Sequence, residues 1–111
     1  MNRGDIFLVD FEPARPTEAN KIRPSILITN NQANLYGTNV MVVPLTSNVN
    51  KIYPFQLFLS AEETGLERDS KAQIELTRSV SKSRLGKRVG VLSQELLGQL
   101  EDRLKLHLGL T

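Results

Sequence analysis

The chain has 111 residues, of which 40% are hydrophobic and 23% charged, and its formal net charge is +2. This length predicts one domain spanning residues 1–111, and the composition excludes an intrinsically disordered chain. The absence of cysteine excludes disulfides, thiolate metal sites and cysteine nucleophiles, and it agrees with a reducing cytoplasm.

The sequence gives no sign of export or of membrane insertion. Its first stretch, MNRGDIFLVDFEP, has a short apolar run that Asp10 interrupts, and it lacks the small-residue cleavage site of a signal peptide. No apolar run approaches the roughly 20 residues that a membrane-spanning helix needs. We therefore expect a cytoplasmic protein that does not enter a membrane.

Short apolar runs separated by turn-forming residues predict the strands of a small β domain. Several such strands, without helix-length patterns between most of them, favour a mainly antiparallel barrel or sandwich. In the third run, Pro44 cannot donate to a ladder, so the strand should end, bulge or lie at an edge there, stopping close to Thr46. The runs are Asp5–Phe11, Ser25–Thr29, Val40–Leu45, Phe55–Leu59, Ala72–Leu76 and Arg88–Leu92.

The C-terminal stretch SQELLGQLEDRLKLHLGL changes to a helical period. A stripe of leucines every four residues is typical of one face of an amphipathic helix. Ser93 is a suitable N-cap, Glu95 suits the first turn, and Gly109 follows as a stop. We expect this helix to lie across the barrel. The stripe consists of Leu96, Leu100, Leu104 and Leu108, widened by Leu97.

The inventory of reactive side chains excludes several kinds of catalyst. His107 is the only histidine, which excludes paired-histidine ribonuclease chemistry and histidine-based triads. No cluster of ligands forms a metal cage and no glycine-rich loop can cradle a phosphate, so we expect neither a metal nor another cofactor. An enzyme with this sequence has to use arginine, carboxylates and hydroxyls.

The long connection between the first two predicted strands is one candidate site. It reads EPARPTEANKIR from Glu12 to Arg23, and long loops on small domains are often functional. Its charged residues include Glu18, Lys21 and Arg23, the last directly before Pro24. The alternative is an ordinary polar loop.

Two further candidate sites lie at and after the third strand. In VVPLTSN, the hydroxyls of Thr46 and Ser47 sit at a strand end, although they could simply bond their own backbone in a turn. In SKAQIELTRSV, Ala72, Ile74 and Leu76 alternate with polar residues. This polar comb could read a nucleic-acid backbone, or it could be the wet face of a sheet. Its members are Lys71, Gln73, Glu75 and Thr77.

Basic residues are concentrated in one part of the chain. From Lys71 to Arg88 there are six Lys or Arg residues against one acid, Glu75. A basic patch on a weakly basic domain suits a polyanionic partner. The alternative is a solvated surface.

Taken in order, several segments resemble the MazF/PemK family of toxins, within the Kid/CcdB superfamily. These segments are RGDIFLVDFEP, RPSILITN, VVPLTSN, GLERDS, RSVSKSRLG and the final GVLS with its helix. The resemblance implies a mainly β, SH3-like antiparallel barrel with a C-terminal helix. It also implies a homodimer that cuts single-stranded mRNA at short sequences without a metal. Its partner would be a MazE-like antitoxin whose acidic segment lies over the RNA groove.

The same resemblance implies particular site residues. Arg23 and Thr46 match the family's catalytic arginine and threonine, and Glu18 matches its loop glutamate. The chain departs from many members around Glu75, where the usual glutamine is missing, so Glu75 and Glu18 both stay candidates for the general base. The implied RNA-binding residues are Ser47, Gln73, Thr77, Arg78 and Lys21.

The expected reaction uses the RNA's own 2′-hydroxyl as nucleophile. Arg23 would neutralise charge on the phosphate and Thr46 would donate a hydrogen bond to it, giving a 2′,3′-cyclic phosphate and a 5′-hydroxyl. One alternative is a non-nuclease toxin on the same barrel that poisons DNA gyrase, although that type uses a tryptophan and this chain has none. Another is a non-catalytic RNA-binding module, which usually relies on more aromatic residues than the 5% present here.

Overall fold

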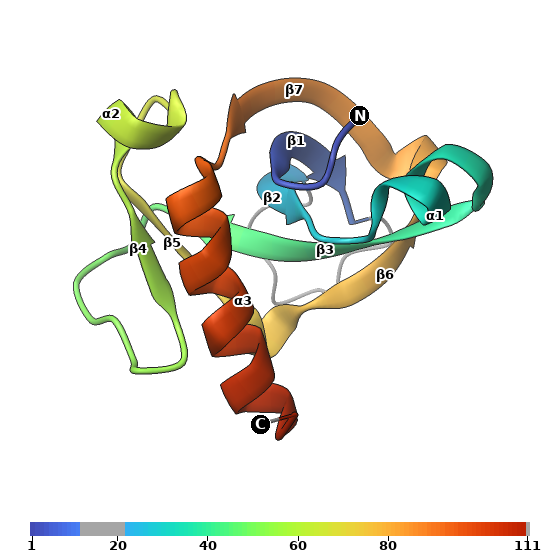
Figure 1. The fold of residues 1–111 in the computed structure, drawn as a ribbon. Coiled ribbons are helices and arrows are strands. Elements are labelled where there is room, and N and C mark those ends of the chain that lie inside the picture. Colours follow the sequence, from blue (N-terminus) through green and yellow to red (C-terminus); the bar gives the residue numbers. More distant parts are fainter. Residues whose placement is uncertain (12–21, 111) are drawn as a thin grey trace.

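The fold is one curved antiparallel sheet crossed by a long C-terminal helix, as seen in a computed structural model that describes residues 1–11 and 22–110 (Figure 1). The strands are β1 (Asp5–Asp10), β2 (Ile22–Leu27), β3 (Asn39–Thr46), β4 (Leu57–Leu59), β5 (Ser70–Ala72), β6 (Arg78–Ser81) and β7 (Leu85–Val91). The helices are α1 (Asn31–Tyr36), α2 (Ala61–Thr64) and α3 (Gln94–Leu108), with 3₁₀ turns η1 (Ile74–Leu76) and η2 (Lys82–Arg84). The predicted class, mainly β with a C-terminal helix, is confirmed.

Strand β3 organises the sheet because it pairs with three other strands. The order along the sheet is β4-β5-β3-β2-β1-β7, and β6 also pairs with β3. One edge of β3 pairs with β2, and its other edge pairs first with β6 and then with β5. In Figure 1, β7 arches over β1 while β4 and β5 diverge on the other side of α3. This curl gives the sheet its half-barrel shape.

Pro44 lies inside β3, and the strand continues through it to Thr46. The predicted strand end near Thr46 is confirmed, whereas the expected interruption at Pro44 does not occur. The reason is the change of partner on that edge. Val42 still pairs with β6 and Leu45 already pairs with β5, so the missing N–H of Pro44 falls between the two ladders.

Two apolar clusters hold the elements together. The larger lies under α3, where Leu96, Leu97 and Leu100 are buried against residues of β1, β2, β3 and β4. The smaller includes Val9, Leu27 and other residues of the sheet. Burial of this kind stabilises by about 25 cal/mol per Å² of apolar surface. The first turns of α3 therefore fasten the helix to the sheet.

The limits of α3 agree with the prediction from sequence. The Ser93 side chain accepts a hydrogen bond from the Leu96 N–H at 3.1 Å, and Gly109 ends the helix with a φ of 70°. The leucine stripe is buried at Leu96, Leu97 and Leu100, whereas Leu108 is 60% exposed. In Figure 1 the end of α3 extends past β3.

The predicted strand over Ala72–Leu76 is wrong in its second half. Strand β5 ends at Ala72, and Ile74–Leu76 forms the 3₁₀ turn η1, closed by a hydrogen bond of 2.7 Å from the Thr77 hydroxyl to the Ile74 carbonyl. The turn directs Ile74 into the core and leaves Leu76 exposed. The expected polar comb is therefore broken, and Lys71, assigned to its wet side, is buried instead.

Sequence patterns also missed the short elements. Strand β6 lies in the basic stretch, where only Val80 is buried among exposed neighbours. Helices α1 and α2 have four to six residues and begin at the capping side chains of Asn30 and Ser60. No helix among the described residues is long and apolar enough to cross a membrane.

Candidate active site

Arg23 is fixed at the start of β2 with its guanidinium directed at the end of β3. Its Nε and Nη2 atoms donate to the Leu45 carbonyl at 3.2 and 2.9 Å, and Nη2 also donates to Oε1 of Gln73. The Arg23 backbone is held between strands, because it pairs with Val9 of β1. A planar group held at these points cannot rotate freely. The predicted arginine is thus preorganised next to the predicted threonine.

Thr46 and Ser47 follow Leu45 directly. The Thr46 Oγ1 accepts a hydrogen bond from the Asn48 N–H at 3.2 Å, which is the turn bond that the sequence left open as an alternative. Accepting this bond orients the hydroxyl but does not use its hydrogen, which remains able to donate. Thr46 is half-buried and Ser47 is exposed. The turn and a role in binding an anion are therefore compatible.

Arg23, Thr46 and Ser47 line one cleft of about 590 Å³. Its opposite walls come from the segment after α2, from Gly65 to Arg68 with Ser70, and from Lys87 to Val89 of β7. Among the described residues, four cationic side chains and one acidic side chain line the cleft, which favours an anionic ligand. The cations are Arg23, Arg68, Lys87 and Arg88, and the acid is Glu67.

The cation Arg88 is held by an acidic residue of β1. Its Nε lies 3.2 Å from Oδ1 of Asp5, and the Asp5 Oδ2 accepts a hydrogen bond from the Asn2 N–H at 2.8 Å. Asp5 is buried. The Arg88 guanidinium is therefore held by Asp5 while the residue lines the cleft. Arg23 is likewise held by hydrogen bonds while it lines the same cleft.

The remaining predicted residues of η1 and β6 have other neighbours. Glu75 is exposed, accepts a hydrogen bond from Nε2 of Gln56 at 2.7 Å, and does not line the cleft. Thr77 closes the η1 turn, and the Arg78 guanidinium lies 5.1 Å from the centroid of the Phe11 ring. Gln73 is the one member of this group that contacts Arg23.

Glu18 and Lys21 belong to residues 12–21, which lie outside the described part of the chain. Their proposed roles stay predictions. Among residues 1–11 and 22–110, no group of three or more His, Cys, Asp or Glu side chains is arranged to hold a metal ion.

Three cleft residues were missed as site residues by sequence reasoning. Arg68 belongs to GLERDS, a segment noted only for its resemblance, while Lys87 and Arg88 were noted only as part of a basic stretch. Charge alone could not separate them from Lys82 and Arg84 of η2, which do not line the cleft. The pairing of β7 with β1 brings Lys87 and Arg88 to the cleft of Arg23, and Arg68 reaches it from the segment after α2.

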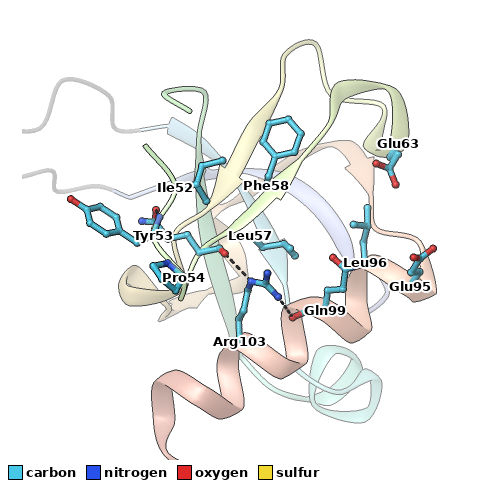
Figure 2. Close-up of a pocket in the computed structure, with 11 residues that line it drawn as sticks. Ile52, Tyr53, Pro54, Leu57, Phe58, Glu63, Glu95, Leu96, Gln99 and Arg103 are labelled. Carbon is cyan, nitrogen blue, oxygen red and sulfur yellow. Dashed lines mark hydrogen bonds between the residues drawn. The ribbon is translucent and has the colours of Figure 1, made fainter. Parts of the chain in front are cut away.

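A second cavity of about 590 Å³ lies between the β3–β4 connection and α3 (Figure 2). Arg103 of α3 spans it, donating from Nε to the Gln56 carbonyl at 2.8 Å and from Nη1 to the Gln99 carbonyl at 3.4 Å. None of the predicted site residues in the described part of the chain lines this cavity. Arg103 fastens the β3–β4 connection to the helix.

Comparison with known proteins gives the same family for nearly the whole chain. Residues 2–108 match the family described as PemK-like, MazF-like toxin of type II toxin-antitoxin system. The chain is 48% identical to Endoribonuclease MazF9 of Mycobacterium tuberculosis, covering 99% of this chain and 98% of that one. It is 31% identical to Endoribonuclease MazF of Staphylococcus saprophyticus, covering 99% and 92%. A mycobacterial endoribonuclease solved in complex with its cognate antitoxin has the same fold, with a TM-score of 0.81, 18% identity, and coverage of 100% and 97%.

Proposed function

The chain belongs to the family of PemK-like, MazF-like toxins of type II toxin–antitoxin systems, and we propose that it arrests growth by cutting single-stranded mRNA at a specific short sequence. Its relatives at 48% and 31% identity are named endoribonucleases, and the chain is an endoribonuclease of that kind. Residues 1–111 constitute one toxin domain that acts in the cytoplasm, where mRNA is found.

Cleavage begins with attack of the ribose 2′-hydroxyl on the neighbouring phosphorus. The new P–O2′ bond forms as the P–O5′ bond breaks, leaving a 2′,3′-cyclic phosphate and a 5′-hydroxyl. Negative charge builds on the phosphate oxygens during this step, and preorganised donors stabilise it best. No metal is required in this scheme, because the charge is met by a guanidinium and a hydroxyl.

The single observation that carries the proposal is the fixed pairing of Arg23 with the strand end at Leu45 and Thr46. Two hydrogen bonds hold the guanidinium beside the residue that precedes Thr46, on a cleft that both residues line. A guanidinium stays charged and is a poor proton donor, so Arg23 acts by electrostatic stabilisation. The Thr46 hydroxyl donates to the same phosphate.

Two carboxylates are candidates for the base that takes the 2′-hydroxyl proton. Glu75 is exposed and bonded to Gln56, so the RNA would have to reach η1 for it to act. Glu18 lies at the family's loop position, outside the described residues. Both stay candidates, and the double variant Glu18→Gln with Glu75→Gln should lose more activity than either single one.

RNA binding would spread over the cationic walls of the cleft. Ser47 directly follows Thr46 in the sequence, Lys21 stands two residues before Arg23, and Thr77 and Arg78 follow η1. Gln73 serves as a positioning residue, because its side-chain oxygen accepts from Arg23. The four cleft cations support contacts to several successive phosphates.

We further propose a cognate antitoxin and a homodimer. A neighbour of the same fold is described in complex with its cognate antitoxin, and an acidic antitoxin segment is complementary to the cationic cleft. Leu106, Leu108 and Leu110 at the end of α3 are exposed, and pairing with a second copy would cover them. The gyrase-poison alternative loses support because both curated relatives are named endoribonucleases.

Incubation of the purified protein with a diverse RNA pool, followed by sequencing of the 5′-hydroxyl ends, tests the proposal. We expect ends at one short sequence from the unchanged protein and far fewer from Arg23→Ala under the same conditions. If the unchanged protein and Arg23→Ala yield the same ends, cleavage does not depend on this site and the proposal is wrong. A supercoiling assay run in parallel would detect the gyrase-poison alternative.

A further inference from the structure

Three rings from two distant parts of the chain form a continuous aromatic cluster outside the cleft. Phe55 lies between the other two: its ring centroid is 5.5 Å from that of Tyr53 and 5.8 Å from that of His107. The Phe55 and His107 planes are inclined by only 17°, so these rings stack, whereas the Tyr53 ring is tilted by 53°. The cluster joins the β3–β4 connection to the last turn of α3.

The outer ring of this cluster is open to solvent. Tyr53 is 44% exposed, and although it is among the residues that line the second cavity, its side chain extends away from Pro54 and Leu57 in Figure 2. A partly exposed aromatic ring presents a flat surface on which another ring can stack. Core packing accounts for Phe55 but leaves the exposed ring of Tyr53 unexplained.

Two ammonium groups lie over the Tyr53 ring in cation–π contacts. The Lys51 Nζ is 4.7 Å from the Tyr53 ring centroid and the Lys71 Nζ is 5.9 Å from it. Lys71 is only 8% exposed and also donates to the Lys51 carbonyl at 2.6 Å, which fixes the connection against β5. A flat ring flanked by cations is the arrangement that single-stranded nucleic acids require, with the base on the ring and the phosphate on the cation.

The connection that carries Tyr53 is held unusually firmly for an exposed segment. The Tyr53 N–H donates to Oε1 of Gln56 at 3.1 Å, and the Gln56 N–H donates to the Tyr53 carbonyl at 2.8 Å. Gln56 itself is 3% exposed and is bonded to Glu75 and to Arg103. The ring is therefore presented in a preorganised position, which reduces the entropy lost on binding.

This surface is adjacent to the active-site strand end. Lys71, which approaches the Tyr53 ring, is the β5 residue paired with Thr46 of β3. Gln56 is bonded to Glu75, two residues after the Gln73 that contacts Arg23. An RNA strand whose scissile phosphate lies at Arg23 and Thr46 therefore needs to extend only a short way to reach Tyr53.

We propose that Tyr53 is a stacking platform for a nucleobase of the substrate RNA that flanks the cut site, with Lys51 contacting the adjoining phosphate. The proposal rests on the proposed function and names a further binding residue for it. Stacking on an aromatic side chain is tolerant of base identity, so the platform adds affinity and register, while other contacts select the sequence. Tyr53 is a binding residue in this scheme and takes no part in proton transfer.

The test measures equilibrium binding of a labelled single-stranded 12-mer pool with 2′-fluoro riboses, which cannot attack their own phosphates. Loss of one stacked base weakens binding roughly tenfold. We expect such a loss for Tyr53→Ala and Tyr53→Leu, and near-unchanged binding for Tyr53→Phe. The matched control is Tyr36→Ala, since Tyr36 is 80% exposed on α1 at the other end of β3. Lys51→Gln should lower the salt slope of binding by about 0.7.

A second arm locates the stacked base within the substrate. In an oligonucleotide containing the mapped cut site, an abasic substitution at the stacked position should weaken binding by the unchanged protein and have no further effect on Tyr53→Ala. Equal binding of all the 12-mers by the unchanged protein and Tyr53→Ala would overturn the proposal, as would a loss of antitoxin binding without a loss of RNA binding. Cleavage of natural RNA by the unchanged protein separately decides the proposed function.

Discussion

Arg23 and Leu45 are joined by two hydrogen bonds, from Nε and Nη2 of the guanidinium to one backbone carbonyl. The acceptor belongs to the residue before Thr46, so the charge of β2 and the hydroxyl of β3 are positioned by the same strand end. A third hydrogen bond, from Arg23 to Gln73, holds the guanidinium from the other side of the strand end, because Gln73 directly follows β5. The position of this arginine is thus set mainly by the backbone of β3.

Replacing Arg23 tests whether cleavage needs the planar set of guanidinium donors or only a positive charge. Arg23→Lys keeps the charge but cannot donate to Leu45 and a phosphate in the same plane. We expect kcat to fall by about 10²-fold for lysine and up to about 10³-fold for alanine, with KM changing much less. Single-turnover cleavage of a substrate with the mapped site measures both. Equal rates for arginine and lysine would mean that only charge is needed.

The Thr46 hydroxyl is tested by two substitutions that differ by one polar group. Thr46→Ser keeps the acceptor for the Asn48 N–H and the donor for the phosphate, whereas Thr46→Val keeps the shape and removes both. We expect near-unchanged cleavage for serine and a loss of roughly 10²-fold for valine. Thermal unfolding of both proteins is the control, because loss of the turn alone should cost only about 1 kcal/mol. A fully active valine variant would remove Thr46 from the mechanism.

The route through the 2′-hydroxyl gives a prediction about the substrate. An RNA with a single 2′-deoxyribose at the cut position has lost its nucleophile, so we expect no cleavage there and unchanged binding. Cleavage of the unmodified RNA should continue in the presence of EDTA, since Arg23 and Thr46 supply the stabilising groups. Product analysis should find a 2′,3′-cyclic phosphate. Cutting of the deoxy substrate at the same bond would exclude this route.

Local signals predicted the parts of the fold that depend on neighbouring residues. Ser93 and Gly109 mark the ends of α3 because capping and a left-handed residue are decided within one turn. The end of β3 at Thr46 also follows local chemistry. The turn over Ile74–Leu76 could not be predicted from alternation, because the burial of Ile74 against other elements overrides the strand pattern.

The candidate site was predictable only in part, for the same reason. Arg23 and Thr46 were identified through the family resemblance, and they do line one cleft. The contact between Arg23 and Gln73 joins residues 50 positions apart, so no local pattern could reveal it. Lys71 was assigned to an exposed comb because strand alternation puts it beside polar residues, yet the β4 pairing and the Lys51 carbonyl cover it.

The basic residues from Lys71 to Arg88 do not all lie on the same surface. This predicts that they contribute differently to the salt dependence of RNA binding. Lys87 lines the cleft of Arg23, whereas Lys82 lies in η2 and does not line it. The slope of log K for single-stranded RNA against log salt should therefore decrease by about 0.7 for Lys87→Gln and stay unchanged for Lys82→Gln. Fluorescence anisotropy at salt concentrations from roughly 50 to 200 mM detects the difference. Equal slopes for the two variants would mean that the cleft does not follow the phosphates.

The leucine stripe of α3 predicts two different effects on stability. Leu100 is fully buried in the larger core cluster, so Leu100→Ala should lower the free energy of unfolding by about 2–5 kcal/mol through lost contacts and a cavity. Leu108 is exposed beyond the sheet, so Leu108→Ala should change it by no more than about 0.5 kcal/mol in dilute protein. Urea denaturation measures both values. A large, concentration-dependent loss for Leu108→Ala would instead indicate that a second copy covers the end of the helix, because association adds to stability only where the partner is bound.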